Sequence, residues 1–224
     1  MSRTIGSQLV GLLKASHFGP TVLVVSITFV VSLKQLSVQG SAEIAAAMFC
    51  GQLVVGWTND LVDFQRDEAA LRLNKPLVVG TITETTIKRS LTLAFLAAFV
   101  ISLWSPLGIH GTAFHFLGLL SATAYNLKLK ATIYSVLPYV VSFGTLPWAI
   151  YAATDRQPPM WLVLTFVLLA SAFHFLNVLK DLEQDRTQEV MGLPQVLGRQ
   201  KSIAVAVVLV LLGVIAMTLG HLRF

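Results

Sequence analysis

The chain has 224 residues, of which 55% are hydrophobic and 12% are charged, and its mean hydropathy is +0.74. Soluble domains carry about 25% charged residues, so this composition excludes an ordinary soluble domain and predicts an all-α, polytopic transmembrane helix bundle. The net charge of +5 does not indicate a nucleic-acid partner, because the basic residues are distributed as in a membrane protein.

Seven apolar stretches are long enough, or nearly so, to cross a membrane as helices. In chain order these predicted spans are 20–38, 42–58, 90–104, 109–124, 133–153, 161–179 and 202–219. The third and fourth are short, and Ser105, Pro106 and Gly108 mark their connection, so these two would alternatively form a less regular pair. No cleavage site follows the N-terminal residues, so we expect no removable signal peptide.

The longest polar stretch lies between the second and third spans, at residues 59–89. Good helix formers over residues 67–73 predict a short cytoplasmic helix there, which an Asn-Lys-Pro sequence would end. The chain contains no low-complexity segment or long linker, and we expect residues 1–224 to form a single domain with an approximate internal duplication.

The basic residues predict the orientation of the chain in the membrane. Seven spans put the N-terminus and the segments 59–89, 125–132 and 180–201 on one side. That side holds 13 of the 16 Lys and Arg residues, and nine of the eleven acids. The positive-inside rule therefore predicts that these segments are cytoplasmic.

An acidic pattern, N-x3-D-x3-D, occurs twice, each time at the cytoplasmic end of a predicted span. The first copy is Asn59, Asp63 and Asp67, and the second, 118 residues later, is Asn177, Asp181 and Asp185. Residues four apart on a helix share one face, with about 6 Å of rise between them. Two such faces brought together would offer oxygen ligands to divalent cations, which would in turn hold the diphosphate of a lipid. Acids at the membrane edge are costly and tend to mark function.

Four segments resemble the UbiA-type family of membrane prenyltransferases. NDLVDFQRDEAALRLNKPL is similar to the first signature of that family, and KDLEQDRTQEVMGLPQVLG is similar to the second. YNLKLKATIYSVLPYVVSFGTLPWA is similar to the loop with a tyrosine and basic residues between the two signatures, and SHFGPT to the entry of the first helix. The resemblance covers about residues 14–200.

The resemblance implies a bundle of transmembrane helices around a central cavity, capped by cytoplasmic loops. It also implies a reaction, in which a prenyl group passes from a polyprenyl diphosphate to an aromatic or other lipophilic acceptor and diphosphate is released. Mg²⁺ would be the cofactor. The metal ligands implied are Asn59, Asp63, Asp67, Asn177, Asp181 and Asp185, and the four aspartates among them would be catalytic.

By the same resemblance, Arg72, Lys128 and Lys130 would bind the diphosphate. Asp60 would lie beside the first metal site, and Tyr125 would lie near the substrate. Each lysine taken alone has a simpler explanation as a topology signal at the membrane surface. The paired acidic motifs are therefore the specific part of the prediction.

Three other functions are alternatives. A terpene cyclase on the same scaffold would ionise its substrate identically, and would capture the cation with the substrate's own double bond. A non-catalytic subunit would bind prenyl lipids without turnover, although intact carboxylates argue against it. A transporter is a weaker alternative, because we find no matching pair of broken helices of the kind that mark a midplane site.

The second copy begins with Asn177, where many relatives have Asp, but the amide keeps an oxygen ligand. Family members usually continue for two helices beyond the span at 202–219, whereas this chain stops at Phe224. Those two helices normally help to close the cavity. We therefore expect one of three consequences: a second subunit of a homo-oligomer supplies the missing wall of the cavity, the cavity is more open to lipid, or the protein has a changed role.

The expected partners are a prenyl diphosphate, a lipophilic acceptor and membrane lipids. We expect an integral protein of a bacterial-type inner (plasma) membrane, with the N-terminus and the active site in the cytoplasm.

Overall fold

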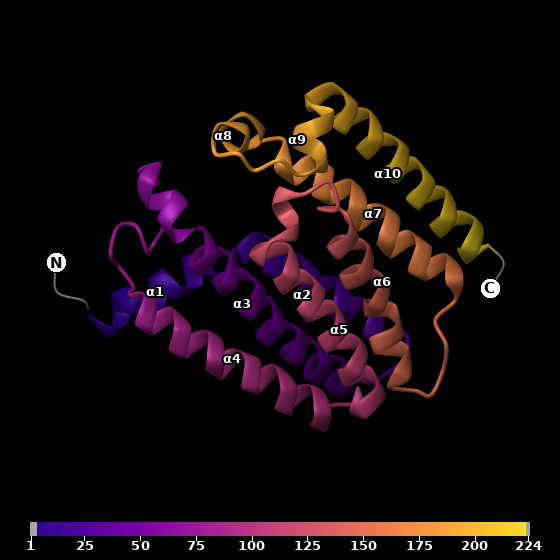
Figure 1. Ribbon diagram of the computed structural model, residues 1–224. Coiled ribbons are helices and arrows are strands. Elements are labelled where there is room, and N and C mark those ends of the chain that lie inside the picture. The colour runs from indigo at the N-terminus through magenta and orange to yellow at the C-terminus, as the bar shows by residue number, and fades with distance from the viewer. Residues whose placement is uncertain (1–3, 223–224) are drawn as a thin grey trace. The chain divides into compact units, whose positions relative to one another are not determined.

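The computed structural model describes residues 4–222, which form helices and connecting loops and contain no strand, as the all-α prediction requires (Figure 1). Arg3 and Arg223, two of the cations used for the orientation, lie outside the described residues. The elements in chain order are α1 (Ile5–Ala15), α2 (Phe18–Ser32), α3 (Val38–Ala69), α4 (Glu84–Trp104), α5 (Gly108–Leu127), the 3₁₀ helix η1 (Leu129–Ala131), α6 (Leu137–Ala152), α7 (Met160–Val178), α8 (Leu182–Thr187), α9 (Leu193–Leu197) and α10 (Arg199–His221).

The predicted number of seven membrane spans is not confirmed. Among the described residues, α3, α4, α7 and α10 are long and apolar enough to cross a membrane, and the α1–α2 pair, bent by 68°, would make a fifth span. Helix α6 has 16 residues, fewer than the ~20 that span a bilayer. Helix α4 is longer than predicted, because the Thr83 hydroxyl caps it by accepting a hydrogen bond from the Thr86 N–H at 3.0 Å.

The predicted short helix at 67–73 is wrong, because its first residues belong to α3. That helix continues without a break to Ala69, and Leu71 then adopts a left-handed backbone with φ of 49°. A helix of 32 residues is about 48 Å long, which exceeds the ~30 Å hydrocarbon core. The polar last third of α3, residues 59–69, therefore lies beyond its apolar part.

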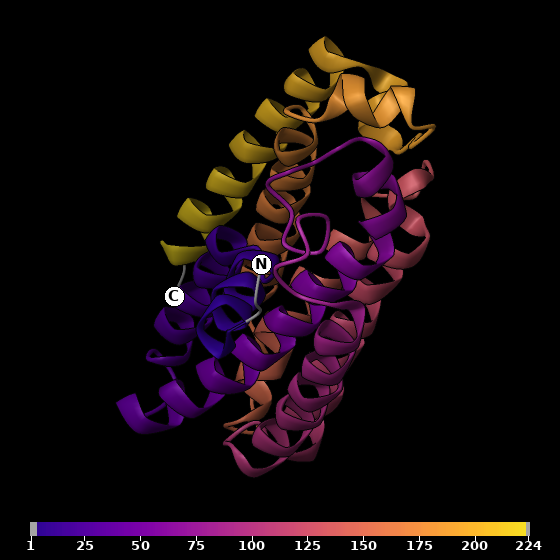
Figure 2. The ribbon, with the colours of Figure 1, turned by 90° about the vertical axis from the view of Figure 1, so that its left-hand side faces the viewer.

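The chain divides into two compact units, Met1–Thr112 and Ala113–Phe224. In the first unit, α3 packs against both α2 and α4. In the second unit, α7 packs against both α6 and α10, and α7 and α10 run side by side in both ribbon views (Figure 2). Each unit thus has a central helix, and the acidic motif begins in the last third of α3 and in the last turn of α7.

The 118-residue offset between the motifs also relates the helices of the two units. Adding 118 to the bounds of α2 gives 136–150, against Leu137–Ala152 for α6, and doing so for α4 gives 202–222, against Arg199–His221 for α10. Gly80 and Gly198, also 118 apart, both have positive φ, 70° and 80°, a conformation that favours glycine. These correspondences support the predicted internal duplication, whereas the single-domain assignment stays a prediction.

The junction between α1 and α2 is fixed against α3 by close packing. A Cβ at Gly56 would lie 2.6 Å from the carbonyl oxygen of Ser16, so glycine is what permits this approach. The indole Nε1–H of Trp57 donates to the carbonyl of Leu12 at 2.9 Å. The next residue after Ser16 is His17, whose position relative to α3 is thereby set.

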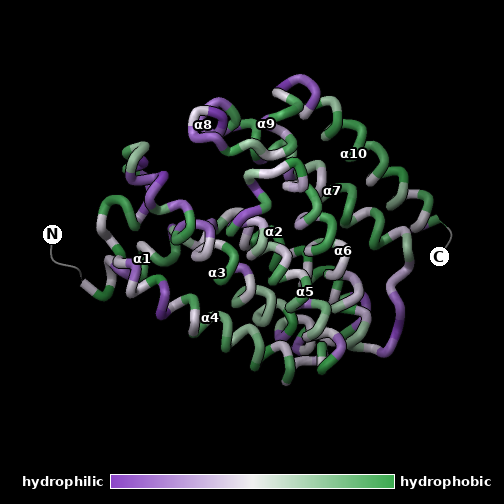
Figure 3. Tube along the Cα trace, viewed as in Figure 1, coloured by the Kyte–Doolittle hydropathy of each residue, from purple (hydrophilic) through white to green (hydrophobic). Residues whose placement is uncertain are grey.

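Apolar side chains dominate the exposed surface of the long helices. Figure 3 shows α10 as mostly hydrophobic and α8 as mostly hydrophilic. On α10, Val207, Leu211 and Ile215 are each more than half exposed. An exposed apolar surface of this extent is unusual in soluble proteins and is typical of helices that contact lipid.

Candidate functional site

The first acidic motif lies on one continuous helix, as predicted. Asn59, Asp63 and Asp67 all belong to α3 and are one turn apart. Asp60 and Asp67 are buried, with exposed fractions of 3% and 4%, and Asp63 is half-buried. Charges buried to this degree require partners.

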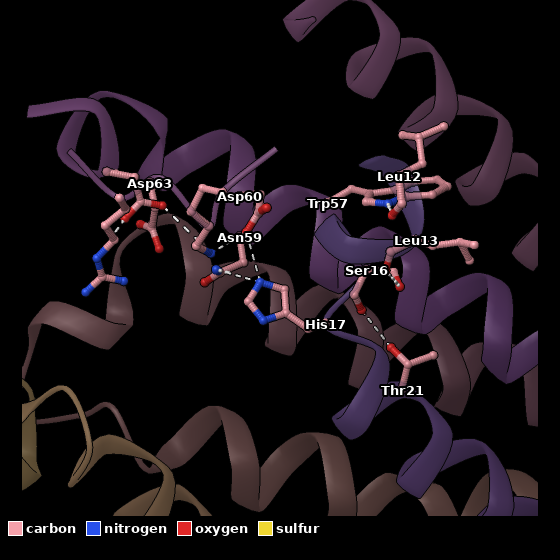
Figure 4. Close-up of polar contacts among 12 residues, drawn as sticks. Leu12, Leu13, Ser16, His17, Thr21, Trp57, Asn59, Asp60 and Asp63 are labelled. Carbon is pink, nitrogen blue, oxygen red and sulfur yellow. Dashed lines mark hydrogen bonds and ion pairs between the residues drawn. The ribbon is translucent and has the colours of Figure 1, made fainter. Parts of the chain in front are cut away.

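Asp60 is the centre of a network of ion pairs and hydrogen bonds. Its Oδ1 atom lies 2.6 Å from Nζ of Lys75 and 2.9 Å from Nε2 of His17. The same Nε2 is 3.3 Å from Nδ2 of Asn59, and Figure 4 shows the imidazole pointing toward both residues of α3. His17 reaches them from the α1–α2 junction, where its φ is 52°. The sequence predicted that Asp60 lies beside the first metal site, but it did not predict the ion pair between Asp60 and Lys75.

The other two aspartates of this segment also have cationic partners. Nζ of Lys75 is 3.8 Å from Oδ2 of Asp67, and Nε of Arg72 is 3.5 Å from Oδ1 of the same residue. Arg66 pairs with Asp63 one turn along α3. The N–H of Arg72 donates to the carbonyl of Asp67 at 2.9 Å, which turns the loop back toward the helix. The loop after α3 therefore brings positive charge to the motif.

The two buried aspartates, which lie past the apolar part of α3, have opposite pKa shifts. Burial by itself would raise the pKa of Asp60, but the hydrogen bond with His17 and the charge of Lys75 outweigh it and lower that pKa. Burial raises the pKa of Asp67, and the charges of Lys75 and Arg72 offset only part of this increase. An additional cation beside Asp67 would therefore favour its charged form.

Replacing Lys75 by methionine tests the network around Asp60. The change leaves the buried Asp60 carboxylate with His17 as its remaining side-chain partner, so we expect a loss of about 2 kcal/mol in the free energy of unfolding. Asp60→Asn combined with Lys75→Met should cost less than the sum of the single changes, because the uncompensated charge is gone. Thermal unfolding in detergent would measure all three variants.

Lys88→Met is the matched control, because Lys88 forms an exposed pair with Glu84 and its loss should change stability by less than about 0.5 kcal/mol. Additive effects of Asp60→Asn and Lys75→Met would contradict the network. Since the pKa of Asp60 is lowered, its stabilising contribution is present above the ordinary value of 3.8 and is lost as the pH falls through the lower folded-state value.

The second acidic motif does not lie on one continuous helix, so the prediction of a shared helical face is wrong for this copy. Helix α7 contains Asn177 and ends at Val178, Asp181 precedes α8, and Asp185 lies within α8. The Asp185 N–H still donates to the Asp181 carbonyl at 2.8 Å, so these two residues stay one turn apart.

Gln195, a residue that sequence reasoning missed, contacts the last acid of this motif. Its Nε2 donates to Oδ2 of Asp185 at 2.8 Å, and its side chain is buried. Arg186 donates from Nε and Nη2 to the main-chain oxygen of Gln195, at 3.0 and 2.6 Å. The signal in the sequence was weak: Gln195 directly follows the Leu-Pro pair of the second signature-like segment.

The loop that carries Lys128 and Lys130 is packed against the segment that leads into α9. A Cβ at Gly192 would lie 2.6 Å from the carbonyl oxygen of Lys130, so the two backbones meet closely. The hydroxyl of Ser135 accepts from the N–H of Leu193 at 3.0 Å. Within the second unit, the loop with Lys128 and Lys130 thus contacts the segment that contains Gln195, whose side chain is hydrogen-bonded to Asp185.

Tyr125 lies in an aromatic cluster of the second unit. Its ring meets the rings of Tyr139 and His174 edge-on, at centroid distances of 5.3 and 5.7 Å. Phe143 stacks on Tyr139 at 6.4 Å, and Nε2 of His174 lies 3.1 Å from the Ser135 hydroxyl. The cluster connects Tyr125 to the basic loop through Ser135, and its contact with substrate stays a prediction.

Comparison with known proteins identifies the family. The chain matches the UbiA prenyltransferase family over residues 9–224. It belongs to that family. Its long apolar helices, together with the family, make it an integral membrane protein. A comparison with curated proteins gives no match.

Solved structures similar to this UbiA family member share its fold. A UbiA homologue from Archaeoglobus fulgidus bound to GPP and Mg²⁺ has a TM-score of 0.77 and 15% identity, over 96% of this chain and 78% of that one. A structure concerning digeranylgeranylglyceryl phosphate synthase has a TM-score of 0.71 and 19% identity, over 96% and 78%. A UbiA homologue from Aeropyrum pernix K1 has a TM-score of 0.68 and 16% identity, over 95% and 78%.

The donor atoms of the two motifs suit a hard divalent cation. They are carboxylate and amide oxygens, which Mg²⁺ prefers, and Asp67 already has two side-chain cations within 4 Å. In residues 4–222, no group of three or more His, Cys, Asp or Glu side chains is arranged to hold a metal ion. The residues of this UbiA family member thus fit Mg²⁺ by the chemistry of their donor atoms, and not by an arrangement already formed.

Proposed function

We propose that this UbiA family member transfers a prenyl group from a polyprenyl diphosphate to an aromatic or other lipophilic acceptor, with Mg²⁺ as cofactor. The observation that carries the proposal is the duplicated acidic motif, which begins in the last third of α3 and in the last turn of α7. Structures of the Archaeoglobus fulgidus homologue bound to GPP or DMAPP together with Mg²⁺ support it.

Under this proposal, both motifs supply oxygen ligands to divalent cations. The proposed metal ligands are Asn59, Asp63, Asp67, Asn177, Asp181 and Asp185. Bound Mg²⁺ supplies positive charge that stabilises the leaving diphosphate. Carboxylates that already lie at the ends of packed helices need little reorganisation to hold that charge.

The proposed diphosphate ligands are Arg72, Lys128 and Lys130. Arg72 stands 3.5 Å from Asp67, so it is positioned beside a proposed metal ligand. Lys130 lies in the loop whose backbone packs on Gly192, which restricts its position. Fixed cations of this kind stabilise charge as it develops on the leaving group.

The proposed reaction breaks the allylic carbon–oxygen bond, and its electron pair stays on the diphosphate oxygen. The acceptor's nucleophilic atom then forms a bond to the allylic carbon and releases a proton. In the cyclase alternative, a double bond of the same chain supplies the electrons. Both reactions begin with ionisation of the diphosphate, so product analysis separates them.

The proposed orientation follows from the basic residues alone. The N-terminus and both motifs are proposed to face the cytoplasm of a bacterial-type inner (plasma) membrane. A prenyl diphosphate with a polar head and an apolar tail would then meet the motifs at the membrane surface.

One incubation tests the function. Detergent-purified protein would receive geranylgeranyl diphosphate and a native lipid extract, with Mg²⁺ or with EDTA. We expect EDTA to lower diphosphate release by at least about 100-fold, and new prenylated masses to form only with Mg²⁺. A cyclic product without an adduct would favour the cyclase, and absence of release with every chain length would support a non-catalytic lipid-binding protein.

A further inference from the structure

Gln195 has a buried amide that is only partly satisfied. Its side chain is 2% exposed, and its Nε2 donates to Oδ2 of Asp185 at 2.8 Å. Its Oε1 is buried without a hydrogen-bond partner among the described residues. An unsatisfied buried carbonyl costs free energy, so an apolar residue would serve packing better here. The contact that this amide provides is the bond to Asp185.

The main chain around Gln195 is held without help from its side chain. Arg186 donates twice to the carbonyl oxygen of Gln195, and the hydroxyl of Ser202 donates to the carbonyl of Pro194 at 3.1 Å. The Leu193 N–H donates to the Ser135 hydroxyl. The path of this segment therefore does not depend on the Gln195 amide.

The first unit contains a corresponding contact. Pro76 and Pro194 are 118 residues apart, as are Asp67 and Asp185, the last acids of the two motifs. Beside Pro76, Lys75 reaches back to within 3.8 Å of Asp67. Gln195, directly after Pro194, reaches back to Asp185. In each unit a polar side chain next to the proline therefore contacts the last acid of the motif, although Lys75 precedes its proline and Gln195 follows its own, so the two residues are not equivalent in the repeat.

We propose that Gln195 is a positioning residue, which orients the Asp185 carboxylate for binding a divalent cation. The inference rests on the proposed function, in which Asp185 is a metal ligand. An amide N–H fixes Oδ2 and leaves the carboxylate its full negative charge. Hydrogen bonds of this kind to metal ligands typically change metal affinity by about 10- to 100-fold. A neutral donor also avoids the competition with a cation that an ammonium group would create.

The test measures metal binding rather than turnover. The full-length chain in detergent would be titrated with Mn²⁺ in the presence of inorganic pyrophosphate, and electron paramagnetic resonance would report free Mn²⁺. For Gln195→Leu and Gln195→Met, we expect the dissociation constant for Mn²⁺ to rise about tenfold while the melting temperature stays the same. Gln200→Leu, at an exposed position of α10, is the matched control and should bind as the wild type does.

Combining Gln195→Leu with Asp185→Asn shows whether Gln195 acts on metal binding through Asp185 or in some other way. If Gln195 acts through Asp185, Gln195→Leu should change Mn²⁺ affinity little further in the Asp185→Asn variant. Unchanged Mn²⁺ affinity in correctly folded Gln195→Leu and Gln195→Met would overturn this inference and leave the proposed function standing. Failure of both variants to fold would also overturn it, since the side chain would then be structural. A wild type that binds no Mn²⁺ with pyrophosphate would overturn the proposed function itself.

Discussion

Asp63→Ala and Asp181→Ala are each expected to lower turnover of a prenyl diphosphate by about 10³-fold or more. Each change removes a carboxylate that the proposed function assigns to metal binding, so charge on the leaving diphosphate would be less stabilised. Both residues are half-buried, Asp63 in the polar last third of α3 and Asp181 just before α8, so the variants should still fold. Diphosphate release at saturating Mg²⁺, together with melting temperatures, would measure both effects.

Two acids outside the pattern provide the controls. Glu68 follows Asp67 on α3 and is exposed, and Glu183 lies between Asp181 and Asp185 with its side chain 85% exposed. Glu68→Gln and Glu183→Gln remove the same charge from the same segments, and turnover should change less than about threefold. Full activity in both Asp63→Ala and Asp181→Ala would show that the proposed metal ligands are wrong.

The double substitution Lys128→Gln with Lys130→Gln is expected to reduce kcat/KM for geranylgeranyl diphosphate by about 100-fold or more. A hydrogen bond to a charged group contributes about 1.5–3 kcal/mol, and the change removes two such donors from the diphosphate. The loop itself should keep its path, because Gly192 packs on the backbone of Lys130 rather than on its side chain. Initial rates over a range of substrate concentrations would give the effect.

Lys201→Gln is the control for this pair, because Lys201 is an exposed cation at the start of α10, outside the basic loop. It removes one positive charge from the same unit without touching the proposed diphosphate ligands. A similar fall in kcat/KM for Lys201→Gln would indicate a general effect of net charge at the membrane surface. Unchanged kcat/KM in the double variant would show that neither lysine binds the diphosphate.

The family and the all-α architecture could be predicted because they rest on local patterns. Apolar runs of nearly 20 residues predict helices wherever they pack, and the spacing of Asn59, Asp63 and Asp67 holds on any continuous helix. The duplication was visible as a repeated motif, and the structure extends it to the flanking helices and to Gly80 and Gly198. The predicted span at 161–179 agrees with α7, but the spacing did not reveal that the helix stops before Asp181, because no proline or glycine lies between Val178 and Asp185.

By itself, the sequence determined the class of the protein, its family and the residue types of the candidate site, since composition and short-range spacing are properties of the chain alone. Only the tertiary structure decided which side chains meet those residues. Lys75 contacts Asp60 because the loop after α3 folds back, and Gln195 contacts Asp185 because Arg186 holds its main chain. Such contacts depend on the path of loops between helices, and that path is set by packing between residues far apart in the sequence.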